Sequence, residues 1–219
     1  MIRGIGFWYH GEWSGGICAS LLWRCVSPRS RRPPADAGDG LVPADNGYLR
    51  GKFLVATARI GDPRFSHTVI YMIQHDAEGA MGLVVNRAYG TGPLNTLLEG
   101  FGIDASEARE TVRLHYGGPV EPRKGFVLHS DDYEGPDTRI VASGVAVSTG
   151  ADVLEALAAG AGPERRLFIL GYAGWGPGQL EGELARDDWV TAPADASLLF
   201  SDDLESLWDE AISRAGVAL

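Results

Sequence analysis

Residues 171–184, GYAGWGPGQLEGEL, place aromatic, amide and carboxylate side chains among five glycines. Dense glycine indicates a backbone with positive φ, or a backbone that another group approaches closely. Tyr172 and Trp175 offer apolar surface with one hydrogen-bonding group each, and Gln179 and Glu181 could orient a polar ligand. The stretch therefore predicts that residues 171–179 bend the backbone sharply after the preceding apolar run and form one wall of the main ligand pocket. A purely structural turn, with Trp175 packed in the core, is the alternative that the sequence leaves open.

Motifs for phosphate binding and for a nucleophilic serine do not occur in the chain. The only Gly-Lys pair, Gly51-Lys52, is followed by Phe53 and cannot form a P-loop. The dinucleotide fingerprint G-x-G-x-x-G fails from Gly174 and from Gly176, and the nucleophile elbow G-x-S-x-G is absent. We therefore expect no cofactor.

The histidines do not form a catalytic or metal-binding pattern. His129, Ser130 and Asp131 are adjacent in sequence, and adjacent residues on a strand point to opposite faces. His75, with Asp76 and Glu78, lies at the end of one expected strand, and His115 and His129 lie on two others. No HExxH motif or paired Cys/His spacing occurs. We expect local hydrogen bonds to satisfy these histidines, and we expect no metal site.

The spacing of the two glutamates in the opening stretch predicts that their side chains point in different directions. Glu181 and Glu183 are two residues apart and would diverge by about 200° on a helix. Gln179 and Glu183 are four residues apart and would share a helix face. Taken alone, Glu181 and Glu183 are interpreted as solvated helix charges.

The charge balance argues against direct binding to DNA. The chain carries a net charge of −10, and residues 47–219 hold 25 acidic against 14 basic residues, with only two lysines. Nucleic-acid affinity depends largely on Lys and Arg contacts to phosphates. No apolar run reaches the ~18 residues that a membrane span requires. The sequence therefore predicts a soluble protein with no nucleic-acid or membrane partner.

Residues 1–46 differ in composition from the rest of the chain. They hold three of the six tryptophans and both cysteines, and they end in a linker-like Pro/Arg/Gly segment. His10, Glu12 and several glycines interrupt the apolar runs that a secretory signal would need. A disordered extension and a true start near Val42 remain alternatives, and in either case we expect residues 1–41 to carry no core.

Strand patterns follow one another from Gly47 onward. Runs of β-branched and aromatic residues predict strands at 52–57, 67–74, 80–86, 111–120, 125–130, 139–148 (one or two), 165–172 and 187–194. The nearly all-apolar run 165–172 is expected at the centre of the sheet. Pro193 places 187–194 at an edge, because proline cannot donate to a ladder.

Helical spacing predicts about four helices in all, the clearest over 92–102, 148–160 and 202–216. Ser148 or Thr149 is expected to cap the second of these, with Asp152 in its first turn. Strands and helices are thus mixed along residues 47–219. The prediction is a single compact α/β, or mixed α+β, domain with a twisted mixed sheet.

Three fragments of this body resemble the YqgE/AlgH family of bacterial proteins. They are GKFLVATARIGDPRFSHTVIYMIQHDAEGAMGLVVNR, VRLHYGGPVEPRKGFVLHS and LFILGYAGWGPGQLEGELARDDWV. The order and spacing of the fragments agree with the family across residues 47–216. The resemblance implies a bifurcated mixed sheet and a cytoplasmic location. It also implies a function that is not established, although family members are often labelled as transcriptional regulators.

The resemblance also marks positions typical of the family. The candidate pocket drawn from these positions consists of Asn86, Gly117, Gly118, His129, Tyr172, Gly174, Trp175, Gly176, Gln179 and Glu181. The first functional hypothesis is a regulatory protein that binds a small ligand or a protein partner. The second is an uncharacterised hydrolase or transferase that uses His129, Asn86 and Glu181. Direct transcriptional control is the third, and the acidic charge balance disfavours it.

Overall fold

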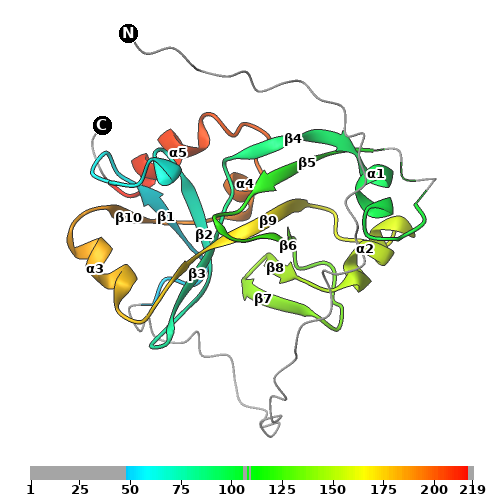
Figure 1. Cartoon of the computed structure of the whole chain (residues 1–219), viewed down its shortest axis with the longest axis horizontal. Helices are drawn as coiled ribbons and strands as arrows, with labels where there is room; N and C mark the ends of the chain where they lie inside the picture. Colours follow the sequence, from blue (N-terminus) through cyan, green and yellow to red (C-terminus); the bar gives the residue numbers. More distant parts are fainter. Residues whose placement is uncertain (1–47, 106–107, 109, 217–219) are drawn as a thin grey trace, which may run out of the picture.

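The computed structural model describes residues 48–105, 108 and 110–216. The predictions for residues 1–46 therefore lie outside the described residues. Within them the chain forms the single mixed α/β domain that the sequence predicts (Figure 1).

Ten strands of the described chain form one sheet. They are β1 Lys52–Ala56, β2 Val69–Asp76, β3 Gly79–Val84, β4 Ala88–Pro93, β5 Thr111–Tyr116, β6 Val120–His129, β7 Thr138–Ala142, β8 Val145–Ser148, β9 Arg166–Trp175 and β10 Trp189–Pro193. Neighbouring strands follow the order β10-β1-β2-β3-β9-β6-β8-β7, and the antiparallel pair β4–β5 branches from β9 through β5. The predicted edge position of residues 187–194 is confirmed, because β10 pairs with β1 at the end of this order.

The described residues also form five α-helices and one short 3-10 helix. They are α1 Leu94–Glu99, α2 Ala151–Ala158, α3 Gln179–Ala185, α4 Ala196–Leu199, α5 Leu207–Arg214 and η2 Pro63–Phe65. Asp152 lies in the first turn of α2 as expected, but Gly150 is the N-cap and no side chain caps the helix. Helix α5 begins five residues later than its pattern predicts, because Asp203 instead accepts the backbone N–H groups of Glu205 and Ser206 in a turn.

Strand β9 is the central strand, and the sheet divides along one of its edges. One edge pairs with β6. The other edge pairs first with β5, in parallel, through Phe168–Leu170 and then with β3, antiparallel, through Ala173–Trp175. The mixed, bifurcated sheet implied by the family resemblance is therefore present, with its branch point beside Gly171. Figure 1 shows β4 and β5 on one side of β9 and β7 and β8 on the other.

The branch point explains part of the glycine content of the opening stretch. Gly171 has φ +75°, and a Cβ there would lie 2.4 Å from the Gly118 carbonyl oxygen. Gly118 has φ +148°, and its Cβ would lie 2.2 Å from the Tyr172 carbonyl carbon. Because the backbone around Gly118 and the backbone of β9 meet within contact distance, no side chain fits at either position.

The strand after Arg165 is longer than its sequence pattern predicts. We expected the backbone to bend from Gly171, but β9 continues to Trp175 and the turn falls at 176–178. Gly171, Gly174 and Trp175 are therefore strand residues. Gly178, with a φ of +74°, is the N-cap of α3.

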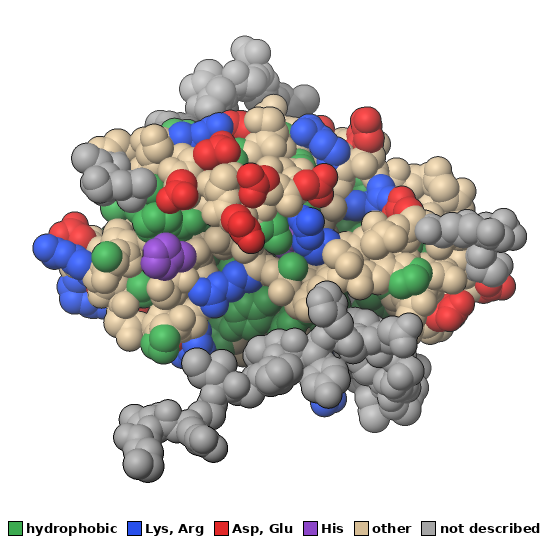
Figure 2. Space-filling view, turned by 90° about the horizontal axis from the view of Figure 1, so that it is seen from above, with side chains coloured by type: hydrophobic (Ala, Val, Ile, Leu, Met, Phe, Trp, Pro, Cys, Tyr) green, Lys and Arg blue, Asp and Glu red, His purple; other side chains and the backbone are tan. Residues whose placement is uncertain are grey.

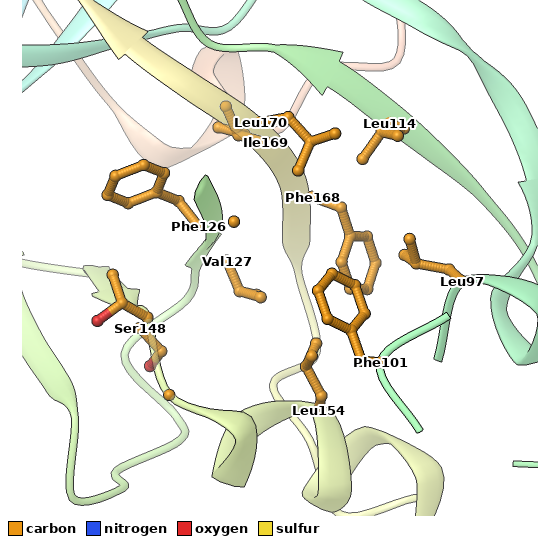
Figure 3. A pocket seen from close by; sticks show the side chains of 13 residues that line it. Leu97, Phe101, Leu114, Phe126, Val127, Ser148, Leu154, Phe168, Ile169 and Leu170 are labelled. Carbon is orange, nitrogen blue, oxygen red and sulfur yellow. The ribbon is translucent and has the colours of Figure 1, made fainter. Parts of the chain in front are cut away.

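The core consists of three clusters, each formed by helices that pack on part of the sheet. Helices α4 and α5 cover one cluster, Leu180 of α3 contributes to a second, and α1 and α2 cover the third. Figure 3 shows Leu97, Phe101, Leu154 and Phe168 directed into the apolar space of this third cluster, beside β9. That pocket has a volume of only about 30 Å³, room for about two water molecules and well short of a small-molecule site.

Candidate functional site

Three of the sequence-predicted site residues meet at one cleft. Gly174, Trp175 and Gln179 line a cleft with a volume of about 510 Å³. We call it the aromatic cleft, and its other lining residues are Arg59, Ile60, Gly61, Asp62, Arg64, Phe65, Pro119, Val120, Glu183, Arg186, Asp188 and Trp189. They come from the β1–β2 connection, the start of β6, the end of β9, α3 and the start of β10. The cleft thus depends on segments far apart in the sequence.

Three aromatic rings pack edge to face in the wall of the cleft. The ring centroids of Trp175 and Trp189 are 6.0 Å apart, and those of Phe65 and Trp189 are 5.6 Å apart. Trp175 is 8% exposed and Trp189 is 2% exposed. Each indole therefore serves the core and the cleft together, so the structural and the pocket-wall readings of Trp175 both describe part of what the ring does.

Glu183 joins the two tryptophans through one carboxylate oxygen. The indole N–H groups of Trp175 and Trp189 each donate to Oε2 of Glu183 over 2.8 Å. The Gln179 side-chain amide donates to Oε1 over 2.9 Å. Hydrogen bonds to an ionised acceptor are shorter and stronger than neutral ones. The carboxylate therefore fixes both rings and the amide relative to each other.

Gln179 links this network to the glycine turn. Its Oε1 accepts the Gly176 N–H over 3.2 Å while its Nε2 donates to Glu183. The predicted i, i+4 relation of Gln179 and Glu183 is confirmed by this contact. Gly176 itself does not line the cleft, and a Cβ there would meet nothing within 4 Å.

Two ion pairs, each between an arginine and an aspartate, lie around the aromatic wall. Arg64 contacts Asp62 over 2.6 Å, and Arg186 contacts Asp188 over 2.9 Å. Hydrogen bonds from the Arg64 side chain lower the pKa of Asp62 from its ordinary value. Each guanidinium at the rim is therefore matched by a carboxylate, and the rim suits a ligand with both donors and acceptors.

Asn86 lies outside the cleft but holds the chain that forms one wall of it. Its Oδ1 accepts the Val69 N–H over 2.8 Å, and its Nδ2 donates to the His67 carbonyl over 2.9 Å. The next residue, Arg87, donates to the carbonyls of Arg64 and Ser66. Together these bonds fix the end of the β1–β2 connection, where His67 has a φ of +56°.

Glu181 points away from the cleft, toward β2. Its Oε1 lies 2.9 Å from Nε2 of the buried His75, whose Nδ1 accepts the Leu49 N–H. Because Nδ1 is an acceptor, Nε2 carries the proton and donates to the carboxylate. The carboxylate of Glu181 accepts hydrogen bonds from its own backbone N–H and from His75, and both lower its pKa. Glu181 and Glu183 therefore have different surroundings, as their spacing predicts.

His129, the last residue of β6, lies beside the start of β9, at the end of the central strand that is far from the cleft. It pairs with Arg166 at the start of β9, and the ten residues of β9 put this end roughly 30 Å from Trp175. The ring is fully buried. Its Nδ1 donates to the Ser130 carbonyl over 2.7 Å, and its Nε2 accepts from the Ser148 hydroxyl over 2.9 Å. Burial lowers the pKa of His129, so the ring is a neutral part of the core.

The remaining candidate positions lie at the branch of the sheet. Gly117 and Gly118 contact the backbone of β9. Tyr172 packs against Phe126 with ring centroids 6.1 Å apart, in a different core cluster from Trp175. The ten candidate residues thus fall in separate regions: the cleft and its supports, the branch point, the His75 contact and the buried His129.

Sequence reasoning missed Glu183 and Trp189 as members of the site. Glu183 was interpreted as a solvated charge, although the Gln179–Glu183 spacing and the need of a buried indole N–H for an acceptor were available signals. No local signal connects Trp189 to Trp175, because the two belong to β10 and β9, which do not pair with each other.

Within the described part of the chain, no three His, Cys, Asp or Glu side chains are placed to hold a metal ion. No helix among the same residues is long and apolar enough to cross a membrane.

Comparison with known proteins identifies close relatives. Residues 53–219 match the family model described as AlgH-like. A UPF0301 protein of Methylococcus capsulatus is 50% identical over 86% of this chain and all of its own length, and one of Rhodospirillum rubrum is 44% identical over 81% of the chain and 92% of its own. The solution structure of the AlgH protein from Pseudomonas aeruginosa matches with a TM-score of 0.69 and 40% identity, covering 81% of this chain and 94% of that one.

Proposed function

The chain belongs to the AlgH-like family, and we propose that it is a cytoplasmic regulatory protein that binds a small ligand in the aromatic cleft. The volume of about 510 Å³ falls within the range of roughly 300–1,000 Å³ that is usual for small-molecule sites. The combination of aromatic wall and a few fixed polar groups is also usual for such sites.

The observation that carries this proposal is the hydrogen bonding of Glu183. One carboxylate holds both indoles, so the aromatic wall is already ordered before a ligand arrives. A preorganised surface loses little conformational entropy on binding. Both carboxylate oxygens already accept hydrogen bonds, which suits a positioning role better than proton transfer.

The same geometry gives the enzyme hypothesis less support. It required His129, Asn86 and Glu181 to act together. Asn86 bonds to two backbone groups, Glu181 bonds to His75, and His129 is fully buried roughly 30 Å along β9 from the cleft. Each of the three side chains already has a partner in a different part of the fold.

We propose further that the regulation does not involve direct contact with DNA. The acidic balance of residues 47–219 opposes approach to a polyanion. On the face shown in Figure 2, Lys and Arg side chains are interspersed with Asp and Glu and form no continuous basic surface. A small ligand or another protein is the partner that these charges favour.

The test begins with native mass spectrometry of the full chain purified from its own host. We expect a noncovalent adduct of small-molecule mass. The same protein labelled with 5-fluorotryptophan is then compared by ¹⁹F NMR before and after the adduct is stripped. The signals of Trp175 and Trp189 should move, whereas that of Trp208, which lies on α5 and donates to the Ala56 carbonyl of β1, should not.

A matched pair of substitutions locates the adduct. Gln179→Ala removes an exposed cleft side chain and should reduce the adduct, whereas Arg123→Gln changes an exposed residue that does not line the cleft. The proposal fails if the adduct is absent, or if it shifts Trp208 while leaving Trp175 and Trp189 unchanged.

A further inference from the structure

A second cleft lies between β2 and β3 on one side and β6, β7 and β8 on the other. Its volume is about 560 Å³, and it shares no lining residue with the aromatic cleft. Phe126, Val141 and Val147 form its apolar floor and belong to the core cluster that α4 and α5 cover. Figure 1 shows the β2–β3 and β7–β8 hairpins extending to the same side of β9. We call it the hairpin cleft.

Arg50 brings a positive charge to the wall of the hairpin cleft and forms no ion pair with a described residue. Its Nε donates to the Val141 carbonyl over 3.1 Å, and its Nη2 donates to the Ile140 carbonyl. Carbonyl oxygens fix the guanidinium in place but carry no net charge. A guanidinium has five N–H donors, so several remain for another acceptor. This arrangement differs from the aromatic cleft, where Arg64 and Arg186 are paired with aspartates.

Two further cations line the hairpin cleft. Arg139 is exposed on β7, and its side chain makes no hydrogen bond or ion pair with any described residue. Lys124 lies 5.7 Å from the centroid of the Phe126 ring, and its ammonium also contacts Glu121 over 3.2 Å.

The two carboxylates that line the hairpin cleft form no ion pair with its arginines among the described residues. They are Asp76 and Asp137. Asp76 accepts hydrogen bonds from the Gln74 side chain and the Glu78 N–H, and no ion pair joins either carboxylate to an arginine among the described residues. Arg50 and Arg139 therefore lie over an apolar floor without acidic partners in the described part of the chain, and the full chain has a net charge of −10.

We propose that the hairpin cleft binds an amphipathic anion, a small molecule that joins an apolar body to one carboxylate or other anionic headgroup. The apolar body lies on Phe126, Val141 and Val147. The headgroup accepts hydrogen bonds from the free N–H groups of Arg50 and from Arg139. This site is additional to the aromatic cleft and does not depend on the function proposed for it.

Octanoate and octylammonium are the probes, because they carry similar eight-carbon apolar bodies and opposite charges. The ¹⁵N-labelled full chain is titrated with each and followed by ¹H–¹⁵N NMR. Octanoate should shift the amides of 139–141 and of Phe126 in a saturable way, with a Kd of about 1 mM or tighter. Octylammonium at the same concentrations should leave them unchanged.

Arg139→Gln is the decisive variant, because the side chain is exposed and has no partner among the described residues, so its change should not impair folding. It should weaken octanoate binding by about fivefold or more. Arg123→Gln, which removes one positive charge from an exposed position outside the cleft, should not weaken it. The proposal is overturned if octanoate produces no saturable shift, if octylammonium binds equally well, or if the two variants bind octanoate alike.

Discussion

Replacement of Glu183 by alanine should destabilise the fold more than its position on a short surface helix suggests. The substitution removes the acceptor of two indole N–H groups and of the Gln179 amide. Trp175 and Trp189 are almost fully buried, so their N–H groups cannot turn toward solvent without moving the rings.

The magnitude follows from the number of donors left without a partner. An unsatisfied buried donor costs about 1–3 kcal/mol. Because Glu183 is only partly buried, water can reach part of the vacated space, and the lower half of that range applies to each indole. We expect a loss of about 2–4 kcal/mol in the free energy of unfolding. At roughly 2–4 °C per kcal/mol for a chain of this size, the melting temperature should fall by about 5–15 °C.

Urea unfolding followed by circular dichroism gives the free energy for the wild type and each variant. Glu183→Gln keeps one carbonyl acceptor for the indoles and should lose less than Glu183→Ala. Glu155→Ala makes the same change on the exposed face of α2 and should stay within about 0.5 kcal/mol of the wild type. A loss for Glu183→Ala no larger than that of Glu155→Ala would refute the view that this carboxylate organises the aromatic wall.

The remaining predictions concern the pH dependence, the branch point, the wall of the cleft and DNA. Burial lowers the pKa of His115 to about 4 in the folded state, so the unfolded state binds more protons below pH ~6.5 and stability falls as pH falls. Between pH 7.5 and 5 this group should lower the free energy of unfolding by about 2 kcal/mol. His115→Asn should flatten the pH dependence measured by urea unfolding at each pH. Gly171→Ala should cost more than about 3 kcal/mol, or prevent folding, because of its positive φ and the nearby Gly118 carbonyl, whereas Gly176→Ala should change stability by less than about 0.5 kcal/mol; equal losses in thermal melts would contradict the close-approach explanation. Asn86→Ala should cost about 2 kcal/mol through its two lost backbone bonds, and Asn86→Asp, which keeps the acceptor for Val69, should cost less in the same melts. A gel shift at low salt should show no binding to duplex DNA, and a sub-micromolar affinity that falls steeply with salt would contradict this.

The position and type of most elements could be predicted from local sequence. The apolar run before Gly171 indicates a central strand because only a strand covered on both faces tolerates it, and β9 is that strand. Strand β4 was not predicted: its residues AYGTGP are mostly exposed, so no alternation of apolar residues marks it. The boundary of β9 was wrong because the glycines after Leu170, which we took as a bend, serve a close approach between strands.

For the site, the sequence predicted only the contact that depends on the spacing of nearby residues. A helix places residues four apart on one face, so the Gln179–Glu183 contact follows from sequence alone. The candidate pocket also grouped His129 and Glu181 with Trp175, although nothing in the sequence gives the distance between them. Register along β9 puts His129 at the opposite end of the strand and leaves Glu181 against His75.

Local sequence indicated the mixed α/β class and the family to which the chain belongs. Its dense glycines indicated either positive φ or a close backbone approach, without choosing between them. The pairing of distant strands was needed to show that the indoles of Trp175 and Trp189 meet at one oxygen of Glu183. It was also needed to show that Arg50 faces carbonyls in its cleft, whereas Arg64 and Arg186 face carboxylates in theirs. Helix and strand periodicity relate only residues that are a few positions apart in the sequence. The cleft is instead set by which strands pair and in what register, and that choice depends on the packing of the whole sheet.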